Sequence, residues 1–169
     1  MATKNVLIIG ANRGIGLNLA KAFVSLSWEV TASIRPQTRD DPSVAELKDT
    51  GATVVEIDYL DDGTIEKAAE AYGDKPLDIL INVGCKLHPQ LATFRLIRTS
   101  QVSPHILCRG MNSLLSSWLR DFESWLWQGP FLTMKHFLPK LEKASQPKIV
   151  NISSIFGSIS GKYFIVLSS

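Results

Sequence analysis

Short apolar runs alternate with segments of helical periodicity along the 169-residue chain. The first run, residues 6–9, is β-branched and apolar with no polar alternation, which suits a central strand covered on both faces of a sheet. Four further runs are rich in apolar and β-branched residues and predict strands at 28–34, 53–57, 77–82 and 148–154. Because helices are expected between these strands, the pattern predicts an α/β fold with a parallel, doubly wound sheet.

Helices are predicted after residue 16 and over residues 43–50, 64–72 and 132–143. In the first, the spacing of Leu19, Phe23 and Leu26 places these apolar residues on one helical face. In the second, Ser43 and Glu46 have the spacing of a capping box, and a C-cap glycine follows at position 51. The last carries its apolar residues at positions 134, 137, 138 and 141.

Residues from about 86 to 121 break this pattern. They mix Leu, Arg, Ser and Trp without a clear period, and Pro89 and Pro104 interrupt them. The length of the chain indicates a single domain over residues 1–169. We therefore interpret the stretch 86–121 as an irregular, atypical insertion in that domain.

Composition and charge exclude several classes of protein. An apolar content of 45% and a charged content of 20% are those of a globular protein. The net charge of +2 comes without a block of like charges, so no nucleic-acid partner is expected. Asn12 and Arg13 interrupt the first apolar run too early for a signal peptide or a membrane span, which predicts a cytoplasmic protein without a membrane partner. Two cysteines and three histidines lie without metal-like intervals, so no metal site is expected.

A glycine-rich turn joins the first predicted strand to the first predicted helix. Gly10, Gly14 and Gly16 can supply a tight turn, a close approach of backbone to phosphate and close helix packing. The helix start then offers unpaired N–H groups and a positive dipole end to an anion. The spacing is not the generic G-x-G-x-x-G of dinucleotide-binding folds, and a glycine turn that merely ends a strand is the alternative.

The spacing of this turn resembles the cofactor loop of the short-chain dehydrogenase/reductase family, whose signature is T-G-x-x-x-G-x-G. Ile9 stands where that family usually has Thr. The resemblance implies a Rossmann-like fold that binds a nicotinamide dinucleotide. Within the turn, it assigns cofactor contacts to Gly10, Asn12, Arg13, Gly14, Ile15 and Gly16.

Two arginines bear on the choice between NAD and NADP. In a dinucleotide fold an acidic residue about 20 positions beyond the turn holds the ribose 2′-hydroxyl, whereas a basic residue accommodates a 2′-phosphate. Arg35 occupies this place and Arg13 lies in the turn itself. Two guanidinium groups without a carboxylate favour NADP, and the alternative is that both arginines are merely solvated.

Three further matches follow at the ends of later strands. Asp58 matches an aspartate that caps the adenine pocket in the family. The alternative is a helix or turn cap, for which Asp61 and Asp62 are better placed. Asn82-Val83-Gly84 resembles the last three residues of the family's Asn-Asn-Ala-Gly turn, which assigns Asn82 and Gly84 to the cofactor's path. Ser154 matches the catalytic serine at the end of the fifth strand, and its alternative is also a turn cap.

The tyrosine that acts as the proton donor in this family is not found at the expected position. The resemblance requires a Tyr about 13 residues beyond the serine and a Lys four residues later, but position 167 is Leu. Tyr163 also lacks a Lys four residues later, and a phenol with an ordinary pKa near 10 has little driving force for proton transfer at neutral pH. We therefore expect a truncated chain with a C-terminally incomplete sheet and weak or no turnover.

The family implies an NADP-dependent oxidoreductase that transfers hydride between the nicotinamide and a small carbonyl or alcohol substrate. The alternative is a non-catalytic NADP-binding module or pseudoenzyme fragment. Members of the family commonly form dimers or tetramers, so the resemblance also implies a homo-oligomer.

Overall fold

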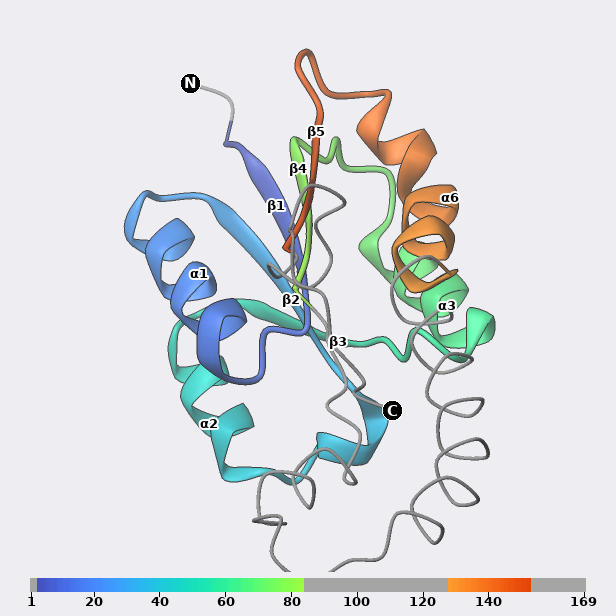
Figure 1. Ribbon diagram of the computed structural model, residues 1–169. Coiled ribbons are helices and arrows are strands. Elements are labelled where there is room, and N and C mark those ends of the chain that lie inside the picture. The colour runs from blue at the N-terminus through green and yellow to red at the C-terminus, as the bar shows by residue number, and fades with distance from the viewer. Residues whose placement is uncertain (1–2, 84–127, 153–169) are drawn as a thin grey trace, which may run out of the picture.

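The computed structural model describes residues 3–83 and 128–152 of the chain (Figure 1). The predicted insertion over about 86–121 lies outside the described residues. Gly84 and Ser154 also lie outside them, so the structure does not test the places expected for these two residues.

Five parallel strands form one sheet in the order β3-β2-β1-β4-β5. The strands are β1 (Asn5–Ile9), β2 (Glu29–Ile34), β3 (Thr53–Glu56), β4 (Ile79–Asn82) and β5 (Lys148–Asn151). The chain moves outward from β1 through β2 to β3 and then crosses back to β4 on the other side of β1. This reversal makes the sheet doubly wound, which confirms the predicted Rossmann-like α/β fold.

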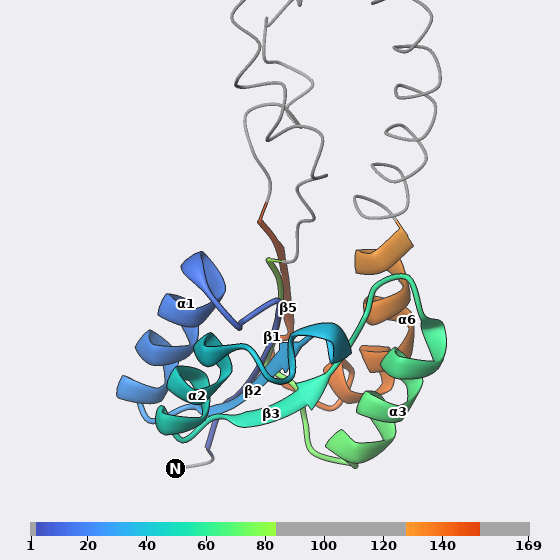
Figure 2. The same ribbon diagram turned by 90° about the horizontal axis from the view of Figure 1, so that it is seen from below.

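Among the described residues, four helices cover the two faces of the sheet. α1 (Gly14–Ser25) and α2 (Pro42–Asp49) lie on one face, and α3 (Asp62–Tyr72) and α6 (Gly129–Leu141) lie on the other (Figures 1 and 2). A short 3₁₀ helix, η1 (Pro36–Thr38), lies between β2 and α2. The described part of the chain is therefore a three-layer sandwich of helices, sheet and helices.

β1 is the central strand because its side chains can be buried on both faces. All five of its residues are buried. Leu7 and Ile9 pack with α3 and α6, whereas Val6 and Ile8 pack with α1 and α2. The uninterrupted apolar run at 6–9 in the sequence follows from this two-sided burial.

The buried face of α1 differs from the predicted one. Leu17 and Ala20 are buried together with Gly16, Leu19 and Phe23 are half-buried, and Leu26 lies beyond the helix with 67% of its surface exposed. The predicted spacing considered only large apolar residues. In the structure, Gly16 must contact the turn before the helix, and this contact sets the rotation of the helix.

The ends of α2 and α6 also correct the sequence analysis. Asp41, not Ser43, is the N-cap of α2, and its Oδ1 accepts from the backbone N of Ser43 over 2.9 Å. α6 begins at Gly129 rather than near 132, and it buries residues at intervals of four: Gly129, Thr133, Phe137 and Leu141. Small residues at the first two positions carry no hydrophobic signal, so the predicted face was shifted toward Met134 and Leu138, of which Leu138 is 44% exposed.

β5 is more exposed than its apolar sequence predicts. All four of its residues are exposed, including Ile149 and Val150. β5 pairs with β4, and within the described residues its other edge has no paired strand. The apolar residues Ile149 and Val150 are therefore exposed in the described part of the sheet.

Candidate functional site

The predicted site residues gather at one edge of the sheet. Gly10 follows β1, Arg35 follows β2 and Asp58 lies two residues beyond β3, while Asn82 ends β4. Because all pairings are parallel, these four strand ends meet at the same carboxyl edge. In doubly wound sheets this edge, at the reversal of strand order, is where ligands bind.

The glycine turn is closed by a contact that only glycine permits. A Cβ on Gly16 would lie 2.2 Å from the carbonyl oxygen of Gly10 and 2.9 Å from the Cα of Ala11. Gly10 itself has φ +83°, a conformation that glycine adopts without strain. The N-terminus of α1 is thereby held directly against the end of β1.

Ser33, on β2, fixes this turn from the neighbouring strand. Its buried hydroxyl accepts from Gly10 N over 3.1 Å, and its carbonyl oxygen accepts from Ala11 N over 2.9 Å. The sequence analysis did not identify this residue. The available signal was a hydroxyl side chain within an otherwise apolar end of a strand.

The N-terminus of α1 is suited to an anion. Arg13 is its N-cap residue in an extended conformation, and no side chain caps the free backbone N–H groups. The first turn holds no acidic residue. Arg13 and Ile15 are exposed and Asn12 is half-buried, so basic charge and unpaired donors lie together at this helix end.

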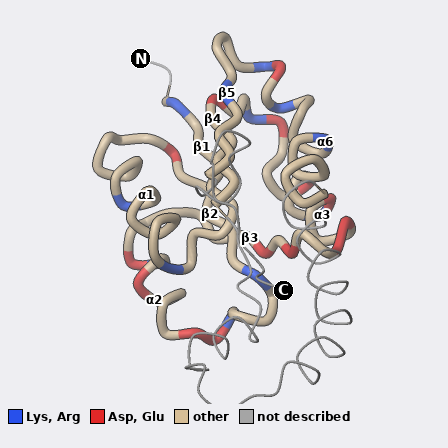
Figure 3. The backbone as a smooth tube through the Cα atoms, in the orientation of Figure 1, with Lys and Arg blue, Asp and Glu red and all other residues tan. Residues whose placement is uncertain are grey.

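Arg35 lies at the start of the loop between β2 and α2. Its carbonyl oxygen accepts from both the backbone N and the hydroxyl of Thr38, each over 2.9 Å, which orders the loop around η1. The hydrogen bonds from Ser43 lower the pKa of the Asp41 carboxyl, and the charge of Arg13 adds to this shift. Figure 3 shows both basic and acidic residues on the loop between β2 and α2.

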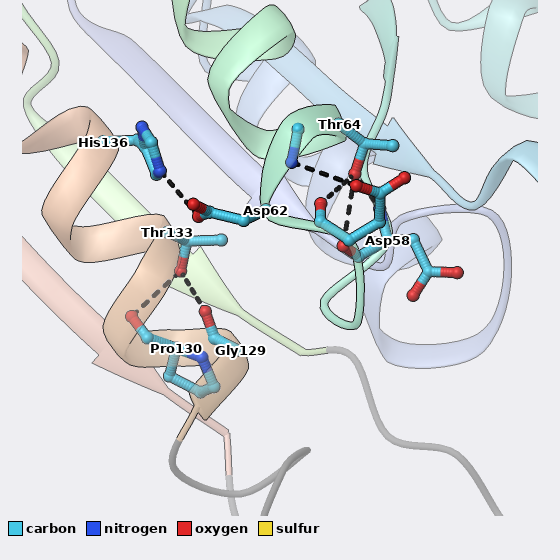
Figure 4. A network of polar contacts seen from close by, with 9 residues as sticks. Asp58, Asp62, Thr64, Gly129, Pro130, Thr133 and His136 are labelled. Carbon is cyan, nitrogen blue, oxygen red and sulfur yellow. Dashed lines mark hydrogen bonds and ion pairs between the residues drawn. The ribbon is translucent and has the colours of Figure 1, made fainter.

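Asp58 is held by contacts from three directions. Its Oδ1 accepts from Leu60 N over 3.1 Å and its Oδ2 accepts from Gln37 Nε2 over 2.9 Å. Its backbone N donates to the hydroxyl of Thr64 over 2.9 Å (Figure 4). The N-cap of α3 is Asp61, which accepts from Gly63 N, as the sequence analysis expected of the acidic residues after Asp58.

A buried polar network fixes Asn82 at the end of β4. Its Oδ1 accepts from the hydroxyls of Tyr59 over 2.9 Å and Thr133 over 3.1 Å, and its Nδ2 donates to Asn151 Oδ1 over 2.8 Å. These bonds link the β3–α3 loop, α6 and β5 to one amide. Burial raises the pKa of Tyr59 well above the usual range of a phenol.

The sequence analysis placed Asn82 but missed its two hydroxyl partners. Thr133 is fully buried on α6, where its hydroxyl also lies 3.0 Å from the carbonyl oxygen of Pro130 and 3.1 Å from that of Gly129 (Figure 4). Tyr59 is separated from Asn82 by 23 positions, and no local pattern connects them. Only the packing of α6 on the β3–α3 loop brings these residues together.

The described residues also bear on metal binding and on membrane-spanning helices. Within residues 3–83 and 128–152 no group of three or more His, Cys, Asp or Glu residues could hold a metal ion. In the same part of the chain no helix has the length and apolar character needed to cross a membrane.

The strand order and the glycine turn at the carboxyl edge define a Rossmann-like α/β domain. The model of the short chain dehydrogenase family matches residues 4–108, which is more than half of the chain. The chain therefore belongs to the short chain dehydrogenase family, which confirms the resemblance read from the sequence.

A relative with a similar sequence agrees with this family assignment. The short-chain dehydrogenase RED3 of Pyricularia oryzae is 28% identical over 162 residues, which cover 91% of this chain. The matched region spans 58% of that relative's length.

Solved structures share the fold. A Pseudomonas aeruginosa RhlG/NADP complex is 20% identical with a TM-score of 0.65, covering 92% of this chain and 56% of that one. A short-chain dehydrogenase/reductase from Burkholderia multivorans with bound NADP is 19% identical with a TM-score of 0.67, covering 95% and 63%. Salutaridine reductase from Papaver somniferum is 21% identical with a TM-score of 0.65, covering 92% and 58%.

Proposed function

We propose that this chain binds NADP at the carboxyl edge of its sheet and acts as an oxidoreductase on a small carbonyl or alcohol substrate. The observation that carries the proposal is the Gly10–Gly16 turn, which holds an uncapped helix N-terminus with a basic N-cap residue against the end of the central strand. The family of the chain and the NADP complexes of RhlG and the Burkholderia multivorans enzyme support it.

The geometry of the turn fits a dinucleotide diphosphate. Gly14 has φ +58°, and a Cβ built on it would have no atom within 4 Å, so the backbone here can be approached closely. The free N–H groups of the first turn of α1 would donate to phosphate oxygens, and the helix dipole has the favourable sign. Asn12 and Ile15 belong to the same turn and would line this part of the cofactor.

The preference for NADP rests on two guanidinium groups. Arg13 occupies the N-cap position of α1 and Arg35 follows the neighbouring strand β2, so both lie at the edge where the ribose would bind. A guanidinium pairs with a phosphate dianion through charge-assisted hydrogen bonds, whereas the 2′-hydroxyl of NAD offers no charge. Asp58, on the next strand end outward, would accept a hydrogen bond from the adenine.

Asn82, Gly84 and Ser154 would serve the reacting end. NADPH supplies hydride when it is bound. Asn82 is held rigidly by two hydroxyl donors, and it would line the path of the nicotinamide half with Gly84. Ser154 would donate a hydrogen bond to the substrate oxygen and so orient it for reduction. A cytoplasmic location and assembly into a homo-oligomer stay predictions of the sequence analysis.

A non-catalytic NADP-binding module is the second candidate function. It is favoured by one feature of the sequence: Tyr163 has Leu167, not Lys, four positions later. Without a neighbouring ammonium group, a tyrosine keeps a pKa near 10 and is a poor acid–base catalyst at neutral pH. Both candidates require the same cofactor site, so they differ only in turnover.

Titration of the full chain with NADPH, followed by nicotinamide fluorescence, tests the cofactor site. The same protein is then mixed with a panel of aldehydes and ketones while NADPH absorbance is followed. Saturable binding with substrate-dependent oxidation supports the oxidoreductase, and binding without oxidation supports the module. The absence of binding at millimolar NADPH would contradict both.

A further inference from the structure

Gln37, on η1, lies between two residues of the proposed cofactor site. It follows Arg35 by two positions, and its Nε2 donates to Asp58 Oδ2 over 2.9 Å. This hydrogen bond joins the loop after β2 to the loop after β3 at the carboxyl edge of the sheet. Gln37 therefore connects the segment proposed to pair with the 2′-phosphate to the carboxylate proposed to meet the adenine.

The chemistry of Asp58 determines how the Gln37 amide is turned. An ionised carboxylate only accepts hydrogen bonds, so the amide nitrogen must face Asp58 and the amide oxygen must face away. Asp58 is itself oriented, because its other carboxylate oxygen accepts from Leu60 N. Within the described residues Gln37 Oε1 has no hydrogen-bond partner and the side chain is exposed, so this oxygen can accept from a ligand.

Asp58 and Gln37 thus present acceptor atoms of two side chains next to each other. The 6-amino group of adenine carries N–H donors on the edge of the base, whereas a 6-oxopurine has an acceptor oxygen at the same position. A pair of acceptors can bind the amino group of adenine, whereas the oxygen of a 6-oxopurine finds no donor there. A ribose phosphate held at Arg35 would place its base toward the adjacent strand β3, where this pair lies.

We propose that Gln37 is a further cofactor-binding residue, which together with Asp58 accepts hydrogen bonds from the adenine 6-amino group and selects adenine over 6-oxopurines. The inference rests on the proposed function, because it requires the dinucleotide to bind at this edge. It adds a base-selective contact from the loop that also carries Arg35.

The experiment compares NADPH with its reduced hypoxanthine analogue, using the full chain and nicotinamide fluorescence. The wild-type protein is expected to bind NADPH about tenfold more tightly than the analogue, because the analogue leaves acceptors without donors. Gln37→Met keeps the length of the side chain and removes both amide groups. It should reduce the ratio to within about threefold, chiefly by weakening NADPH binding.

Gln146→Met is the matched control, because Gln146 is an exposed glutamine between α6 and β5, away from the site. It should retain the wild-type preference. Both variants should keep the wild-type unfolding midpoint, since both side chains are exposed. Loss of the purine preference at an unchanged unfolding midpoint would separate a contact with the dinucleotide from a general loss of stability.

Two results would overturn the role of Gln37 alone: equal affinities of the wild-type protein for the two dinucleotides, or a Gln37→Met protein with an undiminished preference. In both cases NADPH still binds, so the proposed function survives. If the wild-type protein binds neither dinucleotide, the proposed function fails and this inference fails with it.

Discussion

Gly129, the first residue of α6, packs directly on the ring of Tyr59. A Cβ at position 129 would lie 2.3 Å from the Cγ of Tyr59 and 2.7 Å from its Cβ. The ring cannot move away easily, because Tyr59 is buried and its hydroxyl donates to Asn82. The contact therefore fixes how closely α6 approaches the loop that carries Asp58.

Gly129→Ala should consequently destabilise the fold. The added methyl group overpacks a buried contact, which costs about 1–3 kcal/mol of unfolding free energy. Urea denaturation followed by circular dichroism measures this change. Gly63→Ala is the control, because its Cβ would meet only Asp61 Oδ1 at 3.3 Å, and it should stay within about 1 kcal/mol of the wild type. Equal stability of the two variants would contradict the described packing.

The two glycines at the start of α1 should respond differently to substitution. Gly14 has a positive φ but open space, so Gly14→Ala should cost about 1 kcal/mol and Gly14→Asn less, because Asn tolerates this conformation. At Gly16 the constraint is steric, because a Cβ there would clash with the backbone of Gly10. Gly16→Ala should cost about 1–3 kcal/mol and weaken NADPH binding, and Gly16→Asn should be no better. Rescue of position 16 by Asn would show that its constraint is conformational rather than steric.

The arginine substitutions test the preference for NADP. Arg35→Ala and Arg13→Ala should each weaken NADPH binding about 10- to 100-fold and leave NADH binding nearly unchanged, because only the 2′-phosphate loses a charged partner. Fluorescence titrations with both nucleotides measure the ratio. Arg39→Ala is the control on the same loop, since the Arg39 guanidinium already pairs with Glu56 through contacts of 2.6 and 2.7 Å. Parallel losses for NADPH and NADH would contradict the assignment.

The buried tyrosines predict loss of stability in alkali. Burial raises the pKa of Tyr59 above its ordinary value of 10.0, and burial with the charges of Glu29 and Asp78 also raises the pKa of Tyr72. The folded state thus keeps protons that the unfolded state releases above pH 10. Stability is unaffected below pH 10 and falls above it, by about 1.4 kcal/mol per pH unit for Tyr59, and the raised pKa of Tyr72 adds to this fall.

Phenolate absorbance measures this effect. In native protein Tyr59 and Tyr72 should remain protonated until the far-ultraviolet circular dichroism is lost, whereas in concentrated urea all three tyrosines of the chain should titrate near pH 10. Ionisation of all three near pH 10 in a chain that keeps its native dichroism would be the contrary result.

Local sequence pattern was sufficient for the sheet and for the glycine turn. The run at 6–9 predicts a central strand because two-sided burial leaves no polar position in it, and the structure places β1 there. Asp58 and Asn82 were assigned from the family resemblance at the ends of two predicted strands, and parallel pairing brings these strand ends to one edge.

Contacts between distant segments could not be predicted in this way. Ser33, Tyr59 and Thr133 act through partners on other elements, and a hydroxyl side chain in the sequence does not indicate which distant group it will contact. The prediction of which face α1 and α6 bury failed for a related reason. In α1 and α6 the residues nearest the sheet or the neighbouring loop include Gly16 and Gly129, and a glycine gives no hydrophobic signal.

The exposure of β5 divides the site into halves of unequal local stability. β1 and β2 are buried almost throughout, whereas every residue of β5 is exposed, and amide hydrogens exchange fastest where little apolar surface is lost on opening. Opening of β5 would release Asn151 from Asn82 without disturbing the Ser33 contacts that hold the glycine turn. We therefore expect the half proposed to face the dinucleotide phosphates to persist through fluctuations that detach the half proposed to lie beside the reacting end.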